Sequence, residues 1–203
     1  MELDPRGVDR AAEVLARAFQ DDPGFVAALP DPSKRARALP VVQRVVVRYC
    51  VARGWALASS DALEGVLLCL PPEQPRVTST GALRHGALAI PFKAGFGFVR
   101  RMSAIESVVA RLKERHAPAG HAYFLAVGVD PPRQGKGIGG HLIRALLDRL
   151  SSVGAPCFLD TTKPANVGYY ERFGFTRAET LPVPGLGVEV TGMTWRPPAG
   201  AST

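Results

Sequence analysis

The sequence has few of the features that mark disulfide-rich or metal-binding proteins. Its 203 residues include only three cysteines, Cys50, Cys69 and Cys157, which lie far apart in apolar surroundings. They show no metal-ligand spacing, so we expect buried structural thiols; a catalytic thiol is the less favoured alternative. The four histidines show no such spacing either. We therefore expect no metal site.

Long hydrophobic runs and signal features are also missing. No segment reaches the apolar length of a membrane span, and residues 1–6 lack the basic region and apolar run of a secretory signal. These absences predict a cytoplasmic protein that does not bind membranes. No Pro/Gly/Ser tract or charge block divides the chain, which predicts one domain over residues 1–196 and a flexible tail over 197–203.

A concentrated run of basic residues is missing as well, although the formal net charge is +7. The Lys and Arg residues are spread along the chain without interleaved aromatics, which argues against a nucleic-acid partner. A small polyanionic cofactor is the simpler partner. A basic surface that serves only solubility is equally compatible with this pattern.

Hydrophobic periodicity predicts a mainly helical first half. We expect an irregular helical segment over 71–119 to shape an acceptor pocket, to which Phe92, Phe96 and Phe98 together would give an apolar lining. Each phenylalanine taken alone is better explained as core. The predicted elements are a helix over 9–20, a helical region over 33–53 interrupted at Pro40, a hairpin of strands 55–59 and 65–70, and a helix over 102–116.

The second half predicts a strand–helix–strand unit, over 123–129, 137–153 and 156–159, and hence a parallel strand pair with a right-handed crossover. A short helix over 167–172 and two antiparallel strands, 176–181 and 188–195, follow. The predicted fold is therefore mixed α/β.

A glycine-rich turn joins the strand over 123–129 to the following helix. Its residues are Gln134, Gly135, Lys136, Gly137, Ile138, Gly139 and Gly140. The first N–H groups of a helix lack partners and carry partial positive charge, and glycines allow close approach to the backbone. The turn therefore predicts a pyrophosphate site.

Two nucleotide-binding motifs are candidate explanations of this turn. Gly135 to Gly140 satisfies G-x-G-x-x-G, and Asp160 follows about 20 residues later. A dinucleotide fold, however, needs its glycines directly after the strand and further βα units afterwards, and here five residues, 130–134, intervene. A Walker A loop is excluded because no Gly-Lys precedes Ser or Thr.

The turn also reads Q/R-x-x-G-x-G/A, which resembles the acyl-CoA pyrophosphate loop of the GNAT superfamily of N-acetyltransferases. Residues 166–175 resemble that superfamily's segment ending in Tyr-Glu-x-x-Gly-Phe, and 123–131 its fourth strand. The run from 121 to 195 further resembles the branch that contains puromycin N-acetyltransferase. The chain departs from the pattern in having room only for a very short first strand, and in having Asp160 where that branch often has glutamate.

The resemblance implies a mixed, mostly antiparallel sheet with helices on both faces and a parallel pair splayed at the acyl-CoA site. It implies an acyl-CoA half over 121–196 and an acceptor half over 1–120. Acetyl-CoA would be the donor and coenzyme A a product. Backbone amides from Gln134 to Gly140 would hold the pyrophosphate, with Arg133 and Lys136 adding charge unless they are only exposed helix-start residues.

The resemblance also implies roles in catalysis. Pantetheine would bond to the strand at Val127 and Val129, with the Val127 amide stabilising the oxyanion, while Gly128 would mark a bulge or a close backbone approach. Tyr170 matches the tyrosine that protonates the leaving thiolate. Asn166 would bond to pantetheine or cap a helix. Asp160 and Glu64 are candidate bases, beside a water chain.

The implied function is acetyl transfer from acetyl-CoA to a primary amine, by direct attack through a tetrahedral intermediate. The acceptor would be a small molecule such as an aminonucleoside or another antibiotic-like amine, although protein N-termini stay open. The alternative from another class is an acyl-CoA-binding sensor without turnover. The chain would act as a monomer or homodimer.

Overall fold

A six-stranded sheet with the strand order β1-β2-β3-β4-β6-β5 forms the centre of the computed structural model, which describes residues 1–198. The strands β3 and β4 are parallel, and every other neighbouring pair is antiparallel. The predicted mixed sheet with one parallel pair is thus confirmed. The strands are β1 (Trp55–Ala58), β2 (Gly65–Leu70), β3 (Ala122–Val129), β4 (Cys157–Thr161), β5 (Thr176–Val183) and β6 (Val188–Trp195).

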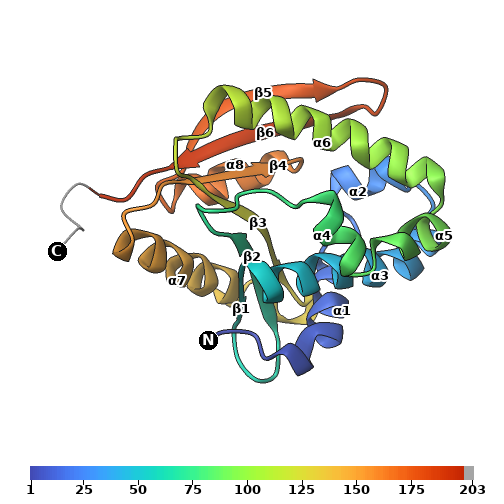
Figure 1. Cartoon of the computed structure of the whole chain (residues 1–203), viewed down its shortest axis with the longest axis horizontal. Helices are drawn as coiled ribbons and strands as arrows, with labels where there is room; N and C mark the ends of the chain where they lie inside the picture. Colours follow the sequence, from blue (N-terminus) through green and yellow to red (C-terminus); the bar gives the residue numbers. More distant parts are fainter. Residues whose placement is uncertain (199–203) are drawn as a thin grey trace.

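Helices cover both faces of this sheet (Figure 1). On one face α7 packs on β2 and β3, and α8 on β4. On the other face α1 and α3 pack together over β2, while α6 lies along β5 and β6. The helices are α1 (Val8–Ala18), α2 (Pro23–Ala28), α3 (Pro32–Arg53), α4 (Ser79–Arg84), α5 (Ile90–Ala94), α6 (Phe96–His116), α7 (Ile138–Ser152) and α8 (Pro164–Glu171).

The predicted interruption of the helical region at Pro40 is wrong, because α3 is continuous there. It runs unbroken for 22 residues from an Asp31 side-chain cap to Gly54, with Pro40 inside it. A proline removes one helical hydrogen bond and disfavours a helix interior. Here the buried residues on both sides of Pro40, from Ala38 to Cys50, pack in the core and keep the two halves continuous.

The phenylalanines of the 71–119 segment do not line one pocket as expected. Phe98 is buried in the core, whereas Phe92 and Phe96 are 83% and 75% exposed. The helix α6 also begins at Phe96 rather than near residue 102. The hairpin of β1 and β2 matches its predicted position, while α8 begins three residues earlier than the predicted helix.

The very short first strand expected from the sequence is a single antiparallel bridge between Glu2 and Leu57. The Leu3 N–H donates to the Ala56 carbonyl at 2.8 Å, which attaches the N-terminal residues to the edge strand β1. The predicted tail, 197–203, lies mostly outside the described residues, so the tail and the domain bounds stay predictions.

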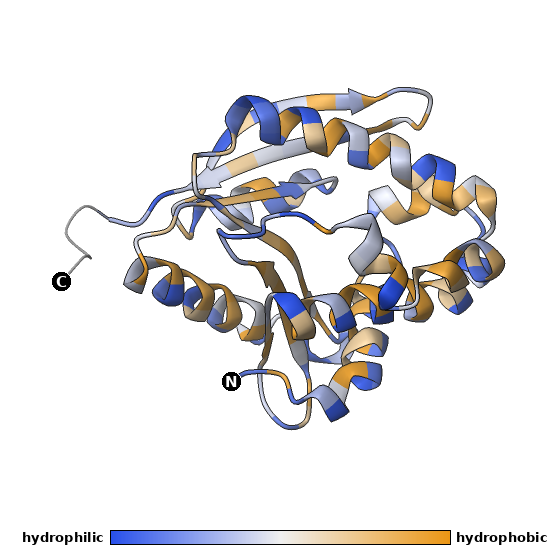
Figure 2. Cartoon of the chain, in the orientation of Figure 1, coloured by the Kyte–Doolittle hydropathy of each residue, from blue (hydrophilic) through white to orange (hydrophobic). Residues whose placement is uncertain are grey.

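Two buried clusters form the core, one on each face of the sheet. Along α7 hydrophobic residues alternate with hydrophilic ones at helical spacing, and the hydrophobic ones, such as Leu142 and Leu146, are those buried against the sheet (Figure 2). No helix within residues 1–198 combines the length and apolarity needed to cross a membrane. The cytoplasmic location stays a prediction from the sequence.

Candidate active site

The parallel strands β3 and β4 part in the middle of the sheet. Their pairing covers only residues 122–124 against 157–159. Beyond Phe124, β3 continues to Val129 beside β2 alone, while β4 continues to Thr161 beside β6. One edge of β3 therefore has main-chain groups that β4 does not pair.

A β-bulge lies where the strands begin to part. Cys69 of β2 pairs with Phe124 and the preceding Leu68 pairs with Ala126, so Leu125 is the extra residue in β3. Of the two expectations for Gly128, the structure supports the close approach and places the bulge elsewhere. A Cβ at Gly128 would lie 2.8 Å from Leu15 Cδ2 and 3.0 Å from Ala18 Cβ, because α1 crosses β3 there.

The direction of the free groups on β3 follows from one hydrogen bond. The Asp130 N–H donates to the Glu64 carbonyl at 2.8 Å, on the β2 side. Main-chain groups alternate along a strand, so Val127 and Val129 direct theirs away from β2. The Gln134 side-chain amide donates to the Val129 carbonyl at 3.0 Å on that side.

The glycine-rich turn opens onto the same side of β3. Gly135 and Gly137 have φ angles of 78° and 80°, a left-handed conformation that glycine adopts without strain. Gly137 caps α7 without a side-chain hydrogen bond, and residues 131–137, which precede the helix, are exposed. The first N–H groups of α7, from Ile138 to Gly140, are thus available to an anion.

Two ion pairs hold this turn against the rest of the fold. Asp130 accepts two hydrogen bonds from Arg17 of α1, and Arg133 contacts Glu64 at 3.1 Å. Glu64, one of the two candidate bases, therefore lies in an ion pair with Arg133 at the loop end of the sheet. The structure does not bring it together with Asp160, the other candidate. Lys136 is exposed in the turn.

Tyr170 lies on the face of the sheet that α7 covers. Its side chain is only 8% exposed, and its ring packs edge-on against Phe124 at a centroid distance of 5.7 Å. Burial, with the negative charge of Asp160 as a smaller contribution, raises the pKa of Tyr170 well above that of a free phenol. The hydroxyl makes no side-chain hydrogen bond with any described residue, so its proton stays available.

Asn166 occupies the first turn of α8 but does not cap the helix. Its side-chain amide donates to the hydroxyl of Thr161, the last residue of β4, at 3.2 Å, and the Lys163 N–H donates to the same hydroxyl. Asn166 therefore ties α8, and with it Tyr170, to the end of the diverging strand.

Asp160 projects from β4 on the opposite face of the sheet. Its Oδ1 accepts a 2.6 Å hydrogen bond from the Tyr123 hydroxyl, and the Lys113 Nζ lies 2.9 Å from the centroid of the Tyr123 ring. Desolvation raises the pKa of Asp160, while Tyr123 and Lys113 oppose that rise. Desolvation lowers the pKa of Lys113 to about 8.

Two more carboxylates belong to this acidic cluster, which we define as Asp22, Glu106 and Asp160. Desolvation raises the pKa of Asp22 and of Glu106, and the charge of Asp160 adds to the effect at Glu106. Asp22 caps α2 and accepts a hydrogen bond from Thr162 at 3.0 Å, which joins α2 to the end of β4. Sequence patterns did not predict that Asp22, Glu106, Lys113 and Tyr123 lie near Asp160. A usable signal was the i, i+7 spacing of Glu106 and Lys113, which puts these two residues on one face of a helix.

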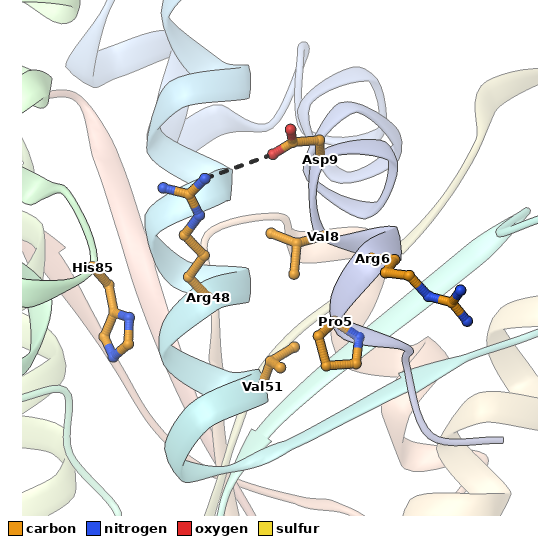
Figure 3. Close-up of a pocket in the computed structure, with 7 residues that line it drawn as sticks. All are labelled: Pro5, Arg6, Val8, Asp9, Arg48, Val51 and His85. Atoms are coloured by element: carbon orange, nitrogen blue, oxygen red, sulfur yellow. Dashed lines mark ion pairs between the residues drawn. The ribbon is translucent and has the colours of Figure 1, made fainter.

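A surface pocket of about 340 Å³ lies elsewhere, between α1 and α3, and contains an ion pair between Arg48 and Asp9 (Figure 3). None of the seven residues that line it belongs to the loop, to Tyr170 or to the acidic cluster. Within residues 1–198, His, Cys, Asp and Glu side chains form no group suited to holding a metal ion.

Comparison with known proteins supports the fold and a family. Residues 93–175, which include all of α6 and continue through the glycine loop to Phe175, match the model of the acetyltransferase (GNAT) family. An uncharacterised N-acetyltransferase of Schizosaccharomyces pombe is 25% identical over 188 residues, which are 88% of this chain and 74% of that protein.

Solved structures share the fold over nearly the whole chain. A structure described as histone acetyltransferase HPA2 and related acetyltransferase, from Corynebacterium glutamicum, aligns with a TM-score of 0.64 and 20% identity, over 98% of this chain and 95% of that one. Arylalkylamine N-acetyltransferase 2 from Aedes aegypti aligns with a TM-score of 0.64 and 13% identity, over 97% of each chain. The chain has the GNAT fold, and its residues 93–175 match the GNAT family model.

Proposed function

We propose that this chain transfers the acetyl group of acetyl-CoA to a primary amine of a small molecule. The observation that carries the proposal is the parting of β3 and β4, with the glycine loop and Tyr170 on one face of the sheet and the acidic cluster on the other. A donor held from one face and an acceptor from the other would meet between the two strands.

The donor side has groups suited to coenzyme A. The N–H groups at the start of α7 would bind the pyrophosphate. The main-chain groups of Val127 and the N–H of Val129 would hydrogen-bond to pantetheine, while the Val129 carbonyl accepts from Gln134. The side chain of Lys136 would add positive charge, while Arg133 would do so from its ion pair with Glu64. These residues would place the thioester carbonyl near the Val127 N–H, which would stabilise the oxyanion.

The acceptor side favours a positively charged molecule. Asp160 and Asp22, which accepts a hydrogen bond from Thr162, place two carboxylates at the end of β4, and Glu106 of α6 adds a negative charge that interacts with that of Asp160. A primary amine carries positive charge at neutral pH. The name of the Aedes aegypti structure also refers to an amine acceptor. Aminonucleosides such as puromycin, which the sequence resemblance suggests, are among the amines to test.

The ammonium group of the acceptor first loses one proton to solvent and becomes a neutral amine, and two further protons then move during the reaction. The amine nitrogen attacks the thioester carbon, a C–N bond forms, and the C–S bond breaks. Asp160 would accept the proton that the amine loses, and the Tyr170 hydroxyl would give its proton to the departing thiolate. The buried phenol holds its proton at neutral pH, and it would pass the proton to a thiolate whose own pKa is raised by the same desolvation.

The first test is the shift in melting temperature on adding saturating acetyl-CoA, with NADH as the control. At about 100 times the dissociation constant, binding adds roughly 2.7 kcal/mol, which is about 5–10 °C for a domain of this size. A shift with NADH alone would support the dinucleotide alternative and overturn the proposal.

A second test separates the enzyme from the acyl-CoA sensor. The protein is incubated with acetyl-CoA and a panel of arylalkylamines, diamines, aminonucleosides and peptides with free N-termini. Release of coenzyme A and the acetylated product are then followed by mass spectrometry. Turnover of any small amine supports the proposal, whereas tight acetyl-CoA binding without product from any acceptor favours a sensor.

A further inference from the structure

The two carboxylate oxygens of Asp160 lie in different surroundings. Oδ1 accepts the 2.6 Å hydrogen bond from the Tyr123 hydroxyl. Oδ2 has no hydrogen-bond partner among the described residues, yet it is not one of the buried polar atoms without a partner. Solvent therefore reaches Oδ2. Oδ1 is fixed by its hydrogen bond, whereas Oδ2 can accept a proton.

Tyr123 is itself fixed on several sides. It lies in β3 opposite Phe158, within the paired part of the two parallel strands. Its ring lies 6.3 Å from that of Phe158, and the Lys113 Nζ approaches its centre. The hydroxyl thus reaches Asp160 from a rigid position, just before the strands part.

Lys113 supplies positive charge without a hydrogen bond to the carboxylate. It lowers the pKa of Asp160, and Asp160 in turn raises that of Lys113. Because the ammonium lies over the Tyr123 ring, Asp160 keeps Oδ2 free instead of losing it to an ion pair. A cation–π contact of this kind is stronger in partly desolvated surroundings.

We propose that Tyr123 and Lys113 are positioning residues for Asp160. Together they keep the Asp160 carboxylate ionised, with its Oδ2 directed toward the acceptor amine. The inference rests on the proposed function, because it assigns the base of that reaction. Both residues act through Asp160 and need not touch the substrate.

Other charged groups also act on Asp160 and Lys113. The charge of Asp22, on the N-terminal side of α2, acts on Asp160 and opposes its ionisation. Glu106 of α6 favours the charged form of Lys113, and Arg76, from the segment before α4, disfavours it. The variants below leave these three groups in place, so their contribution is common to all of the proteins compared.

The test compares Tyr123→Phe with the wild type by the pH profile of kcat/KM and by 13C NMR titration of the Asp160 carboxyl. The phenylalanine keeps the ring and its packing but loses the hydrogen bond that lowers the pKa of Asp160. We expect that pKa, and the acidic limb of the profile, to rise by about one pH unit. On that limb the rate at fixed pH then falls about tenfold, and it recovers at higher pH.

Lys113→Met provides a second variant, in case Tyr123→Phe folds poorly. Removing the ammonium also raises the pKa of Asp160, so the acidic limb again moves to higher pH, and Lys113→Arg restores the charge and most of the profile. Lys93→Met is the matched control, because Lys93 is exposed on α5 and is not among the charges that act on Asp160; this variant should not move the limb.

The outcomes distinguish this inference from the proposed function. A shift in both the NMR titration and the rate profile supports it. An NMR shift without a rate shift shows that Asp160 is not the base, and no NMR shift shows that the two residues do not tune it; either result overturns the inference while acetylation stands. A wild-type chain that acetylates no amine overturns the proposed function, and the inference with it.

Discussion

Arg17 on α1 holds Asp130, the residue directly after β3, through two hydrogen bonds of 2.8 and 3.0 Å. The pair joins a helix of the first half of the chain to the start of the glycine loop, 113 residues later. In the proposed function Asp130 also precedes the residues that bind pyrophosphate. The first helix thereby helps to place the loop.

Replacing Arg17 with alanine should weaken coenzyme A binding without abolishing it. The loop loses one of its two ion pairs and must be ordered when the ligand binds. We expect the dissociation constant to rise about fivefold, which corresponds to roughly 1 kcal/mol. Isothermal titration calorimetry measures it, with Arg6→Ala as the control, because Arg6 forms an exposed ion pair with Asp4 that includes no residue of the loop. Equal affinities in all three proteins would show that the ion pair does not order the loop.

The same pair predicts a pH dependence. The hydrogen bond from Arg17 lowers the pKa of Asp130 in the folded state. A lowered pKa contributes stability above the unfolded value of about 3.9, and this contribution is lost as the pH falls through the folded value. The difference in melting temperature between wild type and Arg17→Ala should therefore be present at pH 6 and shrink below about pH 4. A difference that grows toward low pH would contradict the assignment.

Two glycines of equal backbone strain separate stability from binding. Gly135, in the loop, has φ 78°, and Gly185, in the turn between β5 and β6, has φ 73°; a Cβ added at either would meet no atom within 4 Å. Alanine at either position should cost about 1 kcal/mol of stability through the left-handed conformation. Only Gly135→Ala should also weaken coenzyme A binding, because its backbone belongs to the proposed pyrophosphate site. Calorimetry on both variants decides, and equal affinities would remove Gly135 from that site.

The cysteines test the alternative of a catalytic thiol. Cys50, Cys69 and Cys157 are all buried and free, and burial raises the pKa of Cys50 and Cys157 to about 12. Thiolates are the reactive form, so the native protein should react with a disulfide reagent at pH 8 far more slowly than the unfolded chain. Rapid labelling of one thiol in the native protein, blocked by acetyl-CoA, would revive the catalytic thiol.

The glycine loop at a helix start and the parallel strand pair could be predicted from the sequence because both depend on local patterns. The loop and its helix start depend on glycines that are neighbours along the chain, and the parallel pair follows from a strand–helix–strand pattern. The position of the bulge was not readable: Gly128 suggested one, whereas the extra residue is Leu125. A bulge depends on the register between two strands, which a single strand does not encode.

The surroundings of Asp160 could not be assembled from the sequence. Asp160 and Tyr123 come from β4 and β3, Glu106 comes from α6, and Asp22 caps α2, so no spacing relates them. Glu64 shows the converse, since its carboxylate matched the requirement for a base but contacts Arg133 at 3.1 Å. Residue type alone cannot tell a carboxylate in an ion pair from one that keeps an oxygen free.

Replacing Tyr170 with phenylalanine should reduce kcat by about 100-fold or more and leave acetyl-CoA affinity nearly unchanged, because general acid catalysis contributes about 10²–10⁴-fold. The ring packs against Phe124 and Phe175, and phenylalanine preserves those contacts. The hydroxyl has no side-chain partner among the described residues, so its loss removes a proton donor without leaving a buried group unpaired. Steady-state kinetics together with calorimetry separate the two effects, with Tyr49→Phe as the control. A kcat within about twofold of wild type would assign the proton to water and leave Tyr170 as a core aromatic.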